Sequence, residues 1–430
     1  MVNKREPVRA VIVGAGHRSE WYGNYALEHP NDMKIVGVAD PNPIRREAFQ
    51  KRFGFPTENC FENAEQLSKA PKFADAAING TMDNQHVPTS IPLLRAGYDL
   101  LIEKPFALNE NEMWQLYRAQ QETGRRVMVC HVLRYSPFYQ AIHAEIASGT
   151  LGEIISIEAS EYVSYHHIAT CYVRGKWNSF EKCQSGMLLA KSCHDLDLIM
   201  WLKSAPPKRI SSFGGRFLFR PEKAPKGAGK RCMVDCPLEE TCDYSAKKMY
   251  IDHPDRWRFY VWTELEGKEN VTINDKIELI RNTSPFGRCV YACDNDVVDH
   301  QTLSIEFQDG ATASMSMIGG SGKDDRTLHI VGTKAELYGS FDDGIYTVRA
   351  IDPAPDCEYQ TRVVNPLEGI DRRGHGGGDL RLVEDFVKYV RGEETSPSLT
   401  SLEDSIYGHE AVFLAEKSRE TGQTQTFTLK

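Results

Sequence analysis

A pair of glycines follows the first apolar segment of the chain. Val8–Val13 (VRAVIV) leads directly into Gly14-Ala15-Gly16, and a helical pattern comes next. Gly14 allows a tight turn, and Gly16 allows the backbone to approach a pyrophosphate, which the free N–H groups at a helix N-terminus also favour. The third glycine of the usual fingerprint is replaced by Ser19. The position of the pair after a strand pattern still predicts a dinucleotide-binding turn.

Asp40 ends the second apolar segment, Lys34–Asp40, and stands 24 residues after Gly16. An acidic residue at about this spacing hydrogen-bonds the ribose 2′-hydroxyl of a dinucleotide and repels a 2′-phosphate. Arg45 and Arg46 follow closely; they would accept a phosphate, or they would be exposed residues of the next helix. We therefore expect NAD as the cofactor, with NADP the less favoured alternative.

A second polar turn follows the predicted strand Ala74–Asn79. It contains Thr81, Asp83 and His86 within the run TMDNQH. Ligands of open α/β sheets bind beyond the carboxyl ends of parallel strands, so these side chains are candidates for cofactor contacts. Alternatively, Thr81 or Asp83 caps the following helix and needs no ligand.

One helical segment of the second half, Gly186–Leu202, carries both a lysine and a histidine. Lys191 and His194 stand three residues apart and therefore share a helix face. A histidine with a reference pKa of about 6.5 would act as a general base at neutral pH, or it would be a packed core residue. Lys191 would face a polar cleft or extend to solvent. Asp197 could orient the histidine, whereas Asp195 points elsewhere.

Two further segments combine polar and aromatic groups. Arg174 and Trp177 would supply a bidentate donor and a stacking face for a sugar, or equally an ion pair and core filling between domains. His375 and Asp379 flank three glycines before a helix. Asp379 could cap that helix, but the glycines would also let the loop approach a bound sugar, and we favour the second interpretation.

Three of the 11 cysteines lie within one short segment. Cys232, Cys236 and Cys242 invite a zinc site, but structural zinc is usually held by two CxxC pairs. The spacing here does not match, and no fourth ligand is identifiable. Cys289 and Cys293 form another close pair. We favour ordinary thiols in a reducing compartment and keep the first three cysteines as candidate metal ligands.

Short apolar runs alternate with helical patterns over the first 130 residues, which is typical of βαβ units and a parallel sheet. After about residue 150, runs such as Ile154–Val163 alternate with a period of two, as in a sheet with one wet face. We predict an α/β N-terminal Rossmann domain, residues 1–132, and an α+β C-terminal domain, residues 133–430, with a large open, mostly antiparallel sheet. The final helices, Gly378–Arg391 and Ser401–Arg419, are candidates to pack back on the first domain.

The predicted elements of the first domain are strands at Val8–Val13, Lys34–Asp40, Ala74–Asn79, Leu100–Glu103 and Arg126–Cys130, with helices at Arg18–Glu28, Pro43–Phe53, His86–Ala96 and Glu110–Thr123. Further strands are predicted in the second domain at Arg209–Phe219, His300–Phe307, Ala311–Ile318, Thr327–Val331 and Ile345–Ala350. The least regular stretch is Arg220–Pro254, which is rich in Lys, Cys, Pro and Gly.

Acidic residues outnumber basic ones, 60 to 51, which gives a formal net charge of −9. No basic stripe stands out, so a nucleic acid is not expected as a partner. The longest apolar stretches are strand-sized, so no membrane span is expected, and the N-terminus has no apolar core typical of an export signal. Together with the scattered cysteines, these features favour a cytoplasmic location.

Glu103-Lys104-Pro105 follows the strand pattern Leu100–Ile102. Together with GAGHR, TMDNQH and the helix containing His194-Asp195-Leu196-Asp197, this motif resembles the glucose–fructose oxidoreductase / inositol dehydrogenase (Gfo/Idh/MocA) family over nearly the whole chain. The resemblance implies a Rossmann domain and a C-terminal α/β domain whose open sheet often mediates dimers or tetramers. It also implies NAD(P)-dependent oxidation or reduction at a carbinol of a sugar, cyclitol or glycoside.

The resemblance assigns roles to individual residues. Lys104 is implied to contact substrate and nicotinamide, and His194 to be the catalytic histidine. In the inositol dehydrogenase pattern an aspartate stands four residues before that histidine, but Ala190 occupies this position, so a free inositol is not the expected substrate. The expected cofactor contacts are Gly14, Ala15, Gly16, His17, Arg18, Asp40, Thr81, Asp83, His86, Glu103 and Lys104, and the expected substrate contacts are Lys191, Arg174, Trp177 and His375.

The combined prediction is an NAD-dependent dehydrogenase that acts on the CH–OH group of a small-molecule carbohydrate and works as a homo-dimer or homo-tetramer. One alternative is an enzyme of the same fold that uses bound NAD transiently for glycoside cleavage or epimerisation, with no net redox change. Another is a non-catalytic NAD-binding regulator, against which the intact Lys104 and His194 argue.

Overall fold

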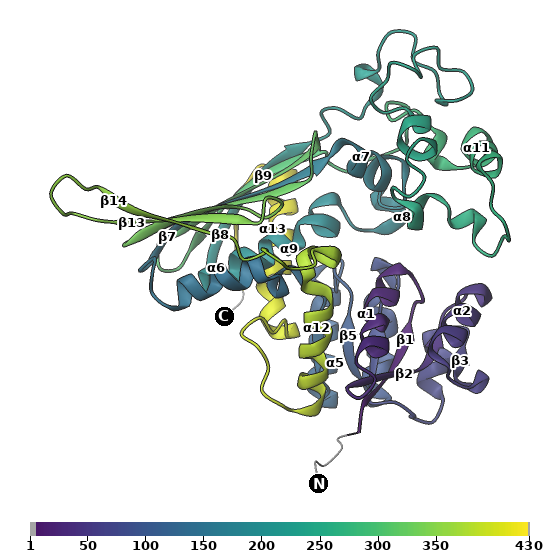
Figure 1. The fold of residues 1–430 in the computed structure, drawn as a ribbon, viewed down its shortest axis with the longest axis horizontal. Helices are drawn as coiled ribbons and strands as arrows, with labels where there is room; N and C mark the ends of the chain where they lie inside the picture. The colour runs from purple at the N-terminus through teal and green to yellow at the C-terminus, as the bar shows by residue number, and fades with distance from the viewer. Residues whose placement is uncertain (1–5, 429–430) are drawn as a thin grey trace.

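The structure, a computed structural model, describes residues 6–428 and contains two β-sheets within them (Figure 1). The N-terminal sheet has six parallel strands in the order β3-β2-β1-β4-β5-β6. The strand order reverses between β1 and β4, where a doubly wound sheet opens a crevice at the carboxyl ends of its strands. The strands are β1 Val8–Val13, β2 Met33–Ala39, β3 Cys60–Phe61, β4 Ala76–Asn79, β5 Asp99–Ile102 and β6 Val127–Val129.

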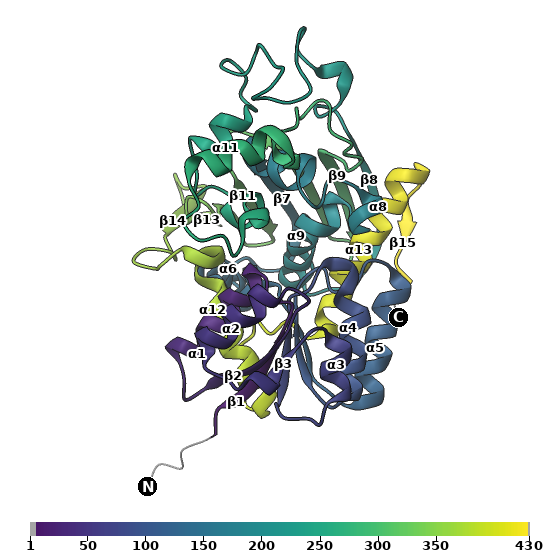
Figure 2. The same cartoon turned by 90° about the vertical axis from the view of Figure 1, so that its right-hand side faces the viewer.

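Helices cover both faces of this sheet, as Figure 2 shows. α1, α2 and the late helix α12 bury apolar side chains against one face, in a core that includes Ile12, Tyr22 and Phe386. α3, α4 and α5 cover the other face, in a core that includes Leu93 and Leu116. These helices are α1 His17–Glu28, α2 Pro43–Phe53, α3 Ala64–Lys69, α4 His86–Arg95, α5 Glu110–Thr123 and α12 Arg373–Arg391.

The second sheet has nine strands in the order β14-β13-β12-β11-β7-β10-β9-β8-β15. Each of its strand pairs is antiparallel except β7 with β10, which confirms the large, mostly antiparallel sheet expected from the period-two patterns. The strands are β7 Ile154–Ser164, β8 Pro207–Gly215, β9 His300–Phe307, β10 Thr312–Ser321, β11 Asp325–Gly332, β12 Ala335–Ser340, β13 Ile345–Ile351, β14 Tyr359–Val364 and β15 Gln425–Thr426.

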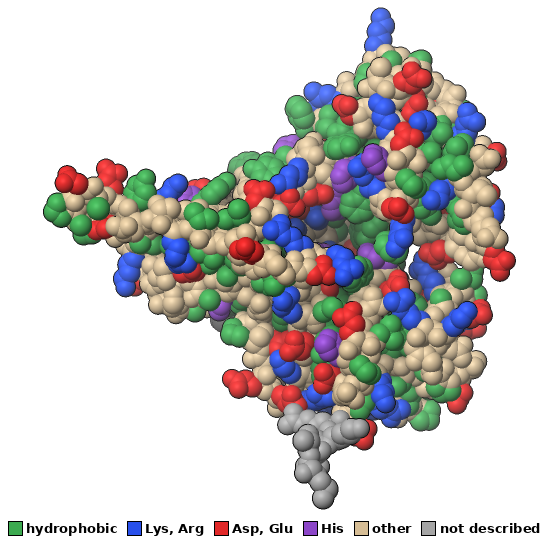
Figure 3. Space-filling model, viewed as in Figure 1, with side chains coloured by type: hydrophobic (Ala, Val, Ile, Leu, Met, Phe, Trp, Pro, Cys, Tyr) green, Lys and Arg blue, Asp and Glu red, His purple; other side chains and the backbone are tan. Residues whose placement is uncertain are grey.

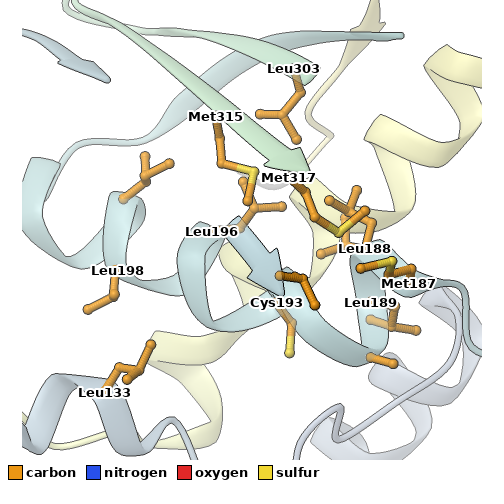
Figure 4. Close-up of a cluster of buried hydrophobic side chains, with 14 of the residues drawn as sticks. Leu133, Met187, Leu188, Leu189, Cys193, Leu196, Leu198, Leu303, Met315 and Met317 are labelled. Carbon is orange, nitrogen blue, oxygen red and sulfur yellow. The ribbon is translucent and has the colours of Figure 1, made fainter. Parts of the chain in front are cut away.

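One face of the second sheet packs on α9, which is buried on nearly every side. Figure 4 shows Leu196 of α9 among Met315, Met317 and Leu303 of the sheet. α13 lies between α9 and α5, so it connects the cores of the two domains. The α-helices of the second domain before α12 are α6 Pro137–Ala147, α7 Tyr165–Ile168, α8 Phe180–Cys183, α9 Met187–Lys203, α10 Arg258–Val261 and α11 Ile273–Asn282, and α13 Leu402–Thr421 follows α12.

Residues 216–299, which we call the insertion, connect β8 to β9 and lie over the Rossmann domain (teal to green in Figure 1). The irregular stretch predicted at Arg220–Pro254 is only part of this segment. Figure 3 shows charged side chains of both signs interspersed over the face in view. No helix within the described residues 6–428 is both long and apolar enough to cross a membrane.

Candidate active site

The glycine turn after β1 leaves no room for a side chain. Gly14 has a φ of +79°, and a Cβ atom there would lie 2.8 Å from the backbone of Thr81. Ser19 stands where the usual fingerprint has its third glycine, and its hydroxyl donates to the Gly14 carbonyl oxygen at 2.6 Å. Space for Ser19 comes from Gly80 at the end of β4, where a Cβ would overlap the serine hydroxyl. Helix α1 therefore still packs closely against the sheet, because Gly80 after β4 leaves the space that a third glycine in α1 would otherwise provide.

This turn opens onto the N-terminus of α1, whose N-cap residue, Gly16, has no side chain to cap the helix. Asp40, just beyond β2, accepts hydrogen bonds from the backbone N–H groups of Ala15, at 2.7 Å, and Asn42, at 2.8 Å. The carboxylate thus connects the glycine turn to the end of β2. Free N–H groups, a glycine-only turn and a buried acid form a set of residues that fits a dinucleotide.

The two arginines after Asp40 both have protein partners. Arg46 donates to the Asp40 carbonyl oxygen at 2.5 Å. Arg45 forms a two-pronged ion pair with Glu266 of the insertion, at 2.9 and 2.8 Å. A 2′-phosphate would have to compete with Glu266 for Arg45.

The TMDNQH turn connects the two domains. Asp83 is buried and accepts from Trp177 Nε1 at 2.9 Å and from the Ser185 hydroxyl at 2.8 Å. His86 contacts the Pro105 carbonyl oxygen through Nδ1 at 2.7 Å and the Thr81 carbonyl oxygen through Nε2 at 3.1 Å. Asp83 caps no helix through its side chain. The polar residues of this turn instead hold the second domain and the EKP segment against the end of β4.

Arg18 connects the glycine turn to the EKP motif. Its Nε donates to Glu103 at 2.8 Å and its Nη2 to Asp379 at 2.7 Å. The Tyr22 hydroxyl also donates to Glu103, at 2.6 Å, and the other carboxylate oxygen accepts from the backbone N–H of Lys104 at 2.9 Å. Burial opposes ionisation, but the charges of Arg18 and Lys104 outweigh it and lower the pKa of Glu103 to about 2. Glu103 is therefore a fixed carboxylate that positions Lys104.

Lys104 and His194 meet across the domain boundary. Lys104 Nζ donates to the carbonyl oxygen of Ala190 in α9 at 2.6 Å. Ala190 stands four residues before His194, so the two lie above one another on the same face of the helix. Burial, and after it the charge of Lys104, lowers the pKa of His194 well below its usual value. The imidazole is thus neutral at neutral pH, as a general base must be.

Further histidines surround His194. The ring of His131 lies 5.5 Å from it and that of His375 lies 6.2 Å from it. His409 lies beyond His131 at 5.5 Å and accepts from the backbone N–H of Phe106 at 3.2 Å. Sequence reasoning missed His131 and His409. His131 lies two residues beyond the end of β6, at the same sheet edge as the other site residues, and this position is the signal that could have found it.

The acidic residues of α9 do not orient His194. Asp197 forms a bidentate pair with Arg134 at 2.7 and 2.5 Å, so it does not take the orienting role toward His194 that its spacing allowed. The spacing of Asp197 and His194 places both on one helix face, but the Asp197 carboxylate binds the charged guanidinium of Arg134 in preference to a neutral imidazole. Asp195 points to the sheet and pairs with Arg326 at 2.8 Å.

Lys191 lies on the same side of α9 as His194 and pairs with Glu161 of β7 at 3.1 Å. Its side chain keeps 16% of its surface exposed, so it is neither fully buried nor free in solvent. Glu161 also binds Arg326 at 2.6 Å. Burial raises the pKa of Glu161 to about 7, although the charges of Arg326 and Lys191 oppose this shift. Lys191 is therefore held beside the site by a carboxyl group that it shares with Arg326.

Aromatic residues close the opposite side. His17 stacks on Phe259 of the insertion with ring centres 4.7 Å apart, and Trp177 meets Tyr260 edge-on at 5.7 Å. Lys176 Nζ lies 4.1 Å above the Trp177 ring. Burial and then the charge of Arg18 lower the pKa of His17 to about 4, so this ring is neutral. The insertion thus covers the glycine turn with aromatic side chains.

Of two predicted substrate contacts, His375 lies near His194, whereas Arg174 does not. His375 has a φ of +50° and an Nδ1 contact to Asp379 at 3.2 Å, which turns its ring toward His194. Arg174 is 1% exposed, and its guanidinium donates to the backbone carbonyls of Arg288 and Tyr244, each at 2.7 Å. Its donors are thus directed into the insertion, because buried carbonyl groups there need partners. The structure does not bring Arg174 to the other site residues.

The candidate metal ligands Cys232, Cys236 and Cys242 lie in the insertion, away from these residues. Within residues 6–428, no three His, Cys, Asp or Glu side chains converge closely enough to share one metal ion.

Family models match both parts of the chain. Residues 8–131 match the oxidoreductase family with an NAD-binding Rossmann fold, and residues 143–427 match the C-terminal alpha/beta domain of the same family. The chain belongs to the Gfo/Idh/MocA oxidoreductase family. This confirms the resemblance found in the EKP, GAGHR and TMDNQH motifs.

Individual relatives are distant. The Bacillus subtilis (strain 168) protein YteT, whose name presents it as an oxidoreductase, is 25% identical over 370 residues, 82% of each chain. Trans-1,2-dihydrobenzene-1,2-diol dehydrogenase of Bos taurus is 27% identical over 48% of this chain and 59% of its own length. The WlbA dehydrogenase of Bordetella pertussis, solved with NADH and UDP-GlcNAcA, shares 15% identity and a TM-score of 0.66, covering 99% of each chain. At that identity the likeness shows the fold alone.

Proposed function

We propose that the protein is an NAD-dependent dehydrogenase that acts on a carbinol of a sugar, cyclitol or glycoside. The observation that carries this proposal is the hydrogen bond from Lys104 Nζ to the Ala190 carbonyl, one helical turn before His194, whose imidazole feels the Lys104 charge. An ammonium group and a neutral imidazole at the edge of a dinucleotide crevice are the two groups that oxidation of an alcohol requires. The diol dehydrogenase and the sugar-nucleotide complex among the relatives agree with this substrate class.

The bound nicotinamide supplies the hydride acceptor when the alcohol is oxidised. His194 takes the hydroxyl proton at Nε2, since Nδ1 is buried and finds no hydrogen-bond partner among the described residues. Lys104 releases the Ala190 carbonyl and donates to the reacting oxygen, where it stabilises the negative charge that develops. Glu103 holds the Lys104 backbone in place throughout. In the reverse direction, the same groups return the proton to a ketone.

The remaining assignments follow from position. Asp40 would accept the ribose 2′-hydroxyl, which favours NAD over NADP. Lys191, Trp177 and His375 surround the place of the substrate and offer a cation, a stacking face and an imidazole. Arg174 is left out of the substrate contacts, because its donors are used within the insertion.

A specific observation favours a second candidate, in which bound NAD is used transiently and no net redox change occurs. Phe259 and Tyr260 cover the glycine turn, and Glu266 is paired with Arg45 at the far end of the crevice. A covered nucleotide leaves slowly, which suits an enzyme that oxidises a glycoside, lets it eliminate or epimerise, and then reduces the product.

One experiment separates these functions. The purified protein is mixed with NAD and a panel of sugars and glycosides, and NADH absorbance and product formation are followed together. Accumulation of NADH supports the dehydrogenase, and product without NADH supports transient redox. If the folded protein binds the nucleotide but converts no carbohydrate, both enzymatic functions are contradicted. The result would then support a non-catalytic NAD-binding regulator.

A further inference from the structure

Four cysteines line one cavity of about 360 Å³ inside the insertion. They are Cys232, Cys236, Cys242 and Cys289, and all four are free thiols. The cavity is separate from the catalytic residues, since neither Lys104 nor His194 lines it. Cys289 supplies the fourth ligand position that the sequence spacing did not reveal.

Backbone pairing brings the fourth cysteine to the other three. The N–H of Cys232 donates to the Gly287 carbonyl at 3.0 Å, and the N–H of Cys289 donates to the Lys230 carbonyl at 2.8 Å. Arg231 and Arg288 form an antiparallel bridge between these hydrogen bonds. The loop of residues 231–242 and the segment after α11 are therefore joined at the cavity wall.

The surroundings suit thiolates. The backbone N–H of Tyr244 donates to Cys242 Sγ at 3.3 Å, and that of Tyr291 bonds Cys289. Hydrogen bonds of this kind, from backbone N–H to sulfur, tune metal-bound thiolates.

Arg174 provides the second observation. Its guanidinium is buried, and Nη2 lies 3.5 Å from Cys232 Sγ. No carboxylate among the described residues lies within 4.0 Å of it, and its other hydrogen-bond partners are neutral. A buried cation without an anion is costly, so this charge calls for a negative group in the adjoining cavity.

The size of the cavity decides between a single ion and a larger group. All four cysteines line the cavity wall, yet no three His, Cys, Asp or Glu side chains of residues 6–428 are close enough to share one metal ion, as a tetrahedral zinc site would need. The volume is also many times the roughly 30 Å³ of a water molecule. An iron–sulfur cluster is held by four cysteine thiolates spread around a polynuclear core. Cys236 is followed by Pro237, as the last cysteine of the bacterial ferredoxin run is.

We propose that Cys232, Cys236, Cys242 and Cys289 hold an iron–sulfur cluster that folds the insertion. Each sulfur binds an iron as thiolate and gives up its proton, and binding an assembled cluster needs no change of oxidation state. The negative cluster neutralises Arg174. Because Lys176 and Trp177 follow Arg174 directly, the cluster also fixes the segment that meets Asp83 at the cofactor crevice.

The test is metal analysis of the full chain, purified without oxygen. Iron and acid-labile sulfide are expected in equal amounts, on the order of two to four of each per chain, with visible absorption that dithionite bleaches. Zinc at one per chain would overturn the proposal. So would metal-free protein that remains metal-free after anaerobic incubation with ferrous and ferric iron in equal amounts and sulfide.

Variants locate the ligands. Cys289→Ser is expected to lose most of the iron and sulfide. Cys293→Ser is the matched control: this neighbour donates through Sγ to the Cys289 carbonyl, does not line the cavity, and should keep the full cluster. Thermal unfolding of both variants separates cluster loss from misfolding. Equal iron content in the two variants would contradict the assignment even if catalysis were unaffected.

Discussion

Lys104 Nζ lies 2.6 Å from the carbonyl oxygen of Ala190, one helical turn before His194. Lys104 belongs to the Rossmann domain, whereas Ala190 and His194 belong to α9 of the second domain. The two groups assigned to proton transfer and oxygen stabilisation therefore come together only while the domains are in contact. Residues that hold the domains, such as Asp83 with Trp177, thus act on catalysis from a distance.

Replacing the base gives the first prediction. His194→Asn should lower kcat by about 10²–10⁴ and leave NAD affinity nearly unchanged, because the residue lies outside the glycine turn. Lys104→Ala should also lower kcat, and the double variant should lose far less than the product of the two effects, since both groups serve one hydroxyl. A kcat for His194→Asn within a few-fold of the unmodified enzyme would remove His194 from this role.

The pH dependence follows from the same residue. A base works only when unprotonated, and burial with the Lys104 charge puts the pKa of His194 well below 6.5. The acid limb of kcat should therefore lie below pH 6.5, with activity flat through neutral pH and falling as the solution becomes more acidic. His194→Asn should lack this limb. An acid limb that persists unshifted in that variant would mean another group is the base.

Asp40 is predicted to set nucleotide preference. Asp40→Ala removes the charge that repels a 2′-phosphate, so the ratio of NAD to NADP affinity should fall. The change also removes the acceptor for the Ala15 N–H, so binding of both nucleotides should weaken. Titration with each nucleotide measures the two effects separately. An unchanged ratio would show that Asp40 holds the loop without contacting the ribose.

The two glycines of the turn should respond differently to alanine. Gly14→Ala places a Cβ 2.8 Å from Thr81 at a φ of +79°, and should cost about 1–3 kcal/mol of stability. Gly16→Ala meets no atom within 4 Å, so its Tm should stay close to that of the parent while its NAD affinity drops. Thermal unfolding and NAD titration of both variants provide the comparison. Equal stability of the two would contradict the packing described for Gly14.

Phe259 of the insertion, which stacks on His17, is predicted to slow the release of NAD from the crevice. Phe259→Ala removes the ring stacked on His17, so NAD should dissociate faster, as stopped-flow fluorescence would measure. Phe217→Ala is a suitable control, since this residue of the insertion is 60% exposed and has no ring contact with the glycine turn. Identical dissociation rates for the two variants would show that the insertion does not retain the nucleotide.

The outer face of the second sheet is predicted to be an oligomer interface. It carries exposed apolar side chains, including Phe213 at 75% and Tyr338 at 54% exposure. Light scattering at micromolar concentration should give a dimer or tetramer, and Tyr338→Lys should shift it toward monomer. A monomeric parent protein would rule out this use of the face.

Much of the fold could be predicted from local patterns, because apolar runs and period-two alternation reflect burial of whole strands. The strand β3 escaped prediction, since Cys60–Phe61 is too short to show any period. The sequence also did not show how the chain tolerates Ser19 in place of the third glycine. Gly80 leaves room for the Ser19 side chain, and this contact can be seen only in the tertiary structure.

The sequence was less informative about which side chains pair with one another in the site and in the cysteine cavity. The i and i+3 spacing placed Asp197 near His194, but Arg134 comes from a distant segment and takes the carboxylate. Likewise, no spacing could show that Cys289 joins the three earlier cysteines, because α11 and its connections lie between them. Long-range charge pairing and loop closure are decided by the whole fold.

The return of α12 to the Rossmann sheet has a consequence for synthesis of the chain. Leu382 and Phe386 complete the core around Ile12 and Tyr22, yet they follow β7–β14 in the chain and therefore leave the ribosome after those strands. The first domain must therefore wait, with one sheet face covered only by α1 and α2, while most of the second domain is translated. During that interval the nascent chain presents a substrate for chaperones, and a fragment ending near residue 132 would remain in this unfinished state.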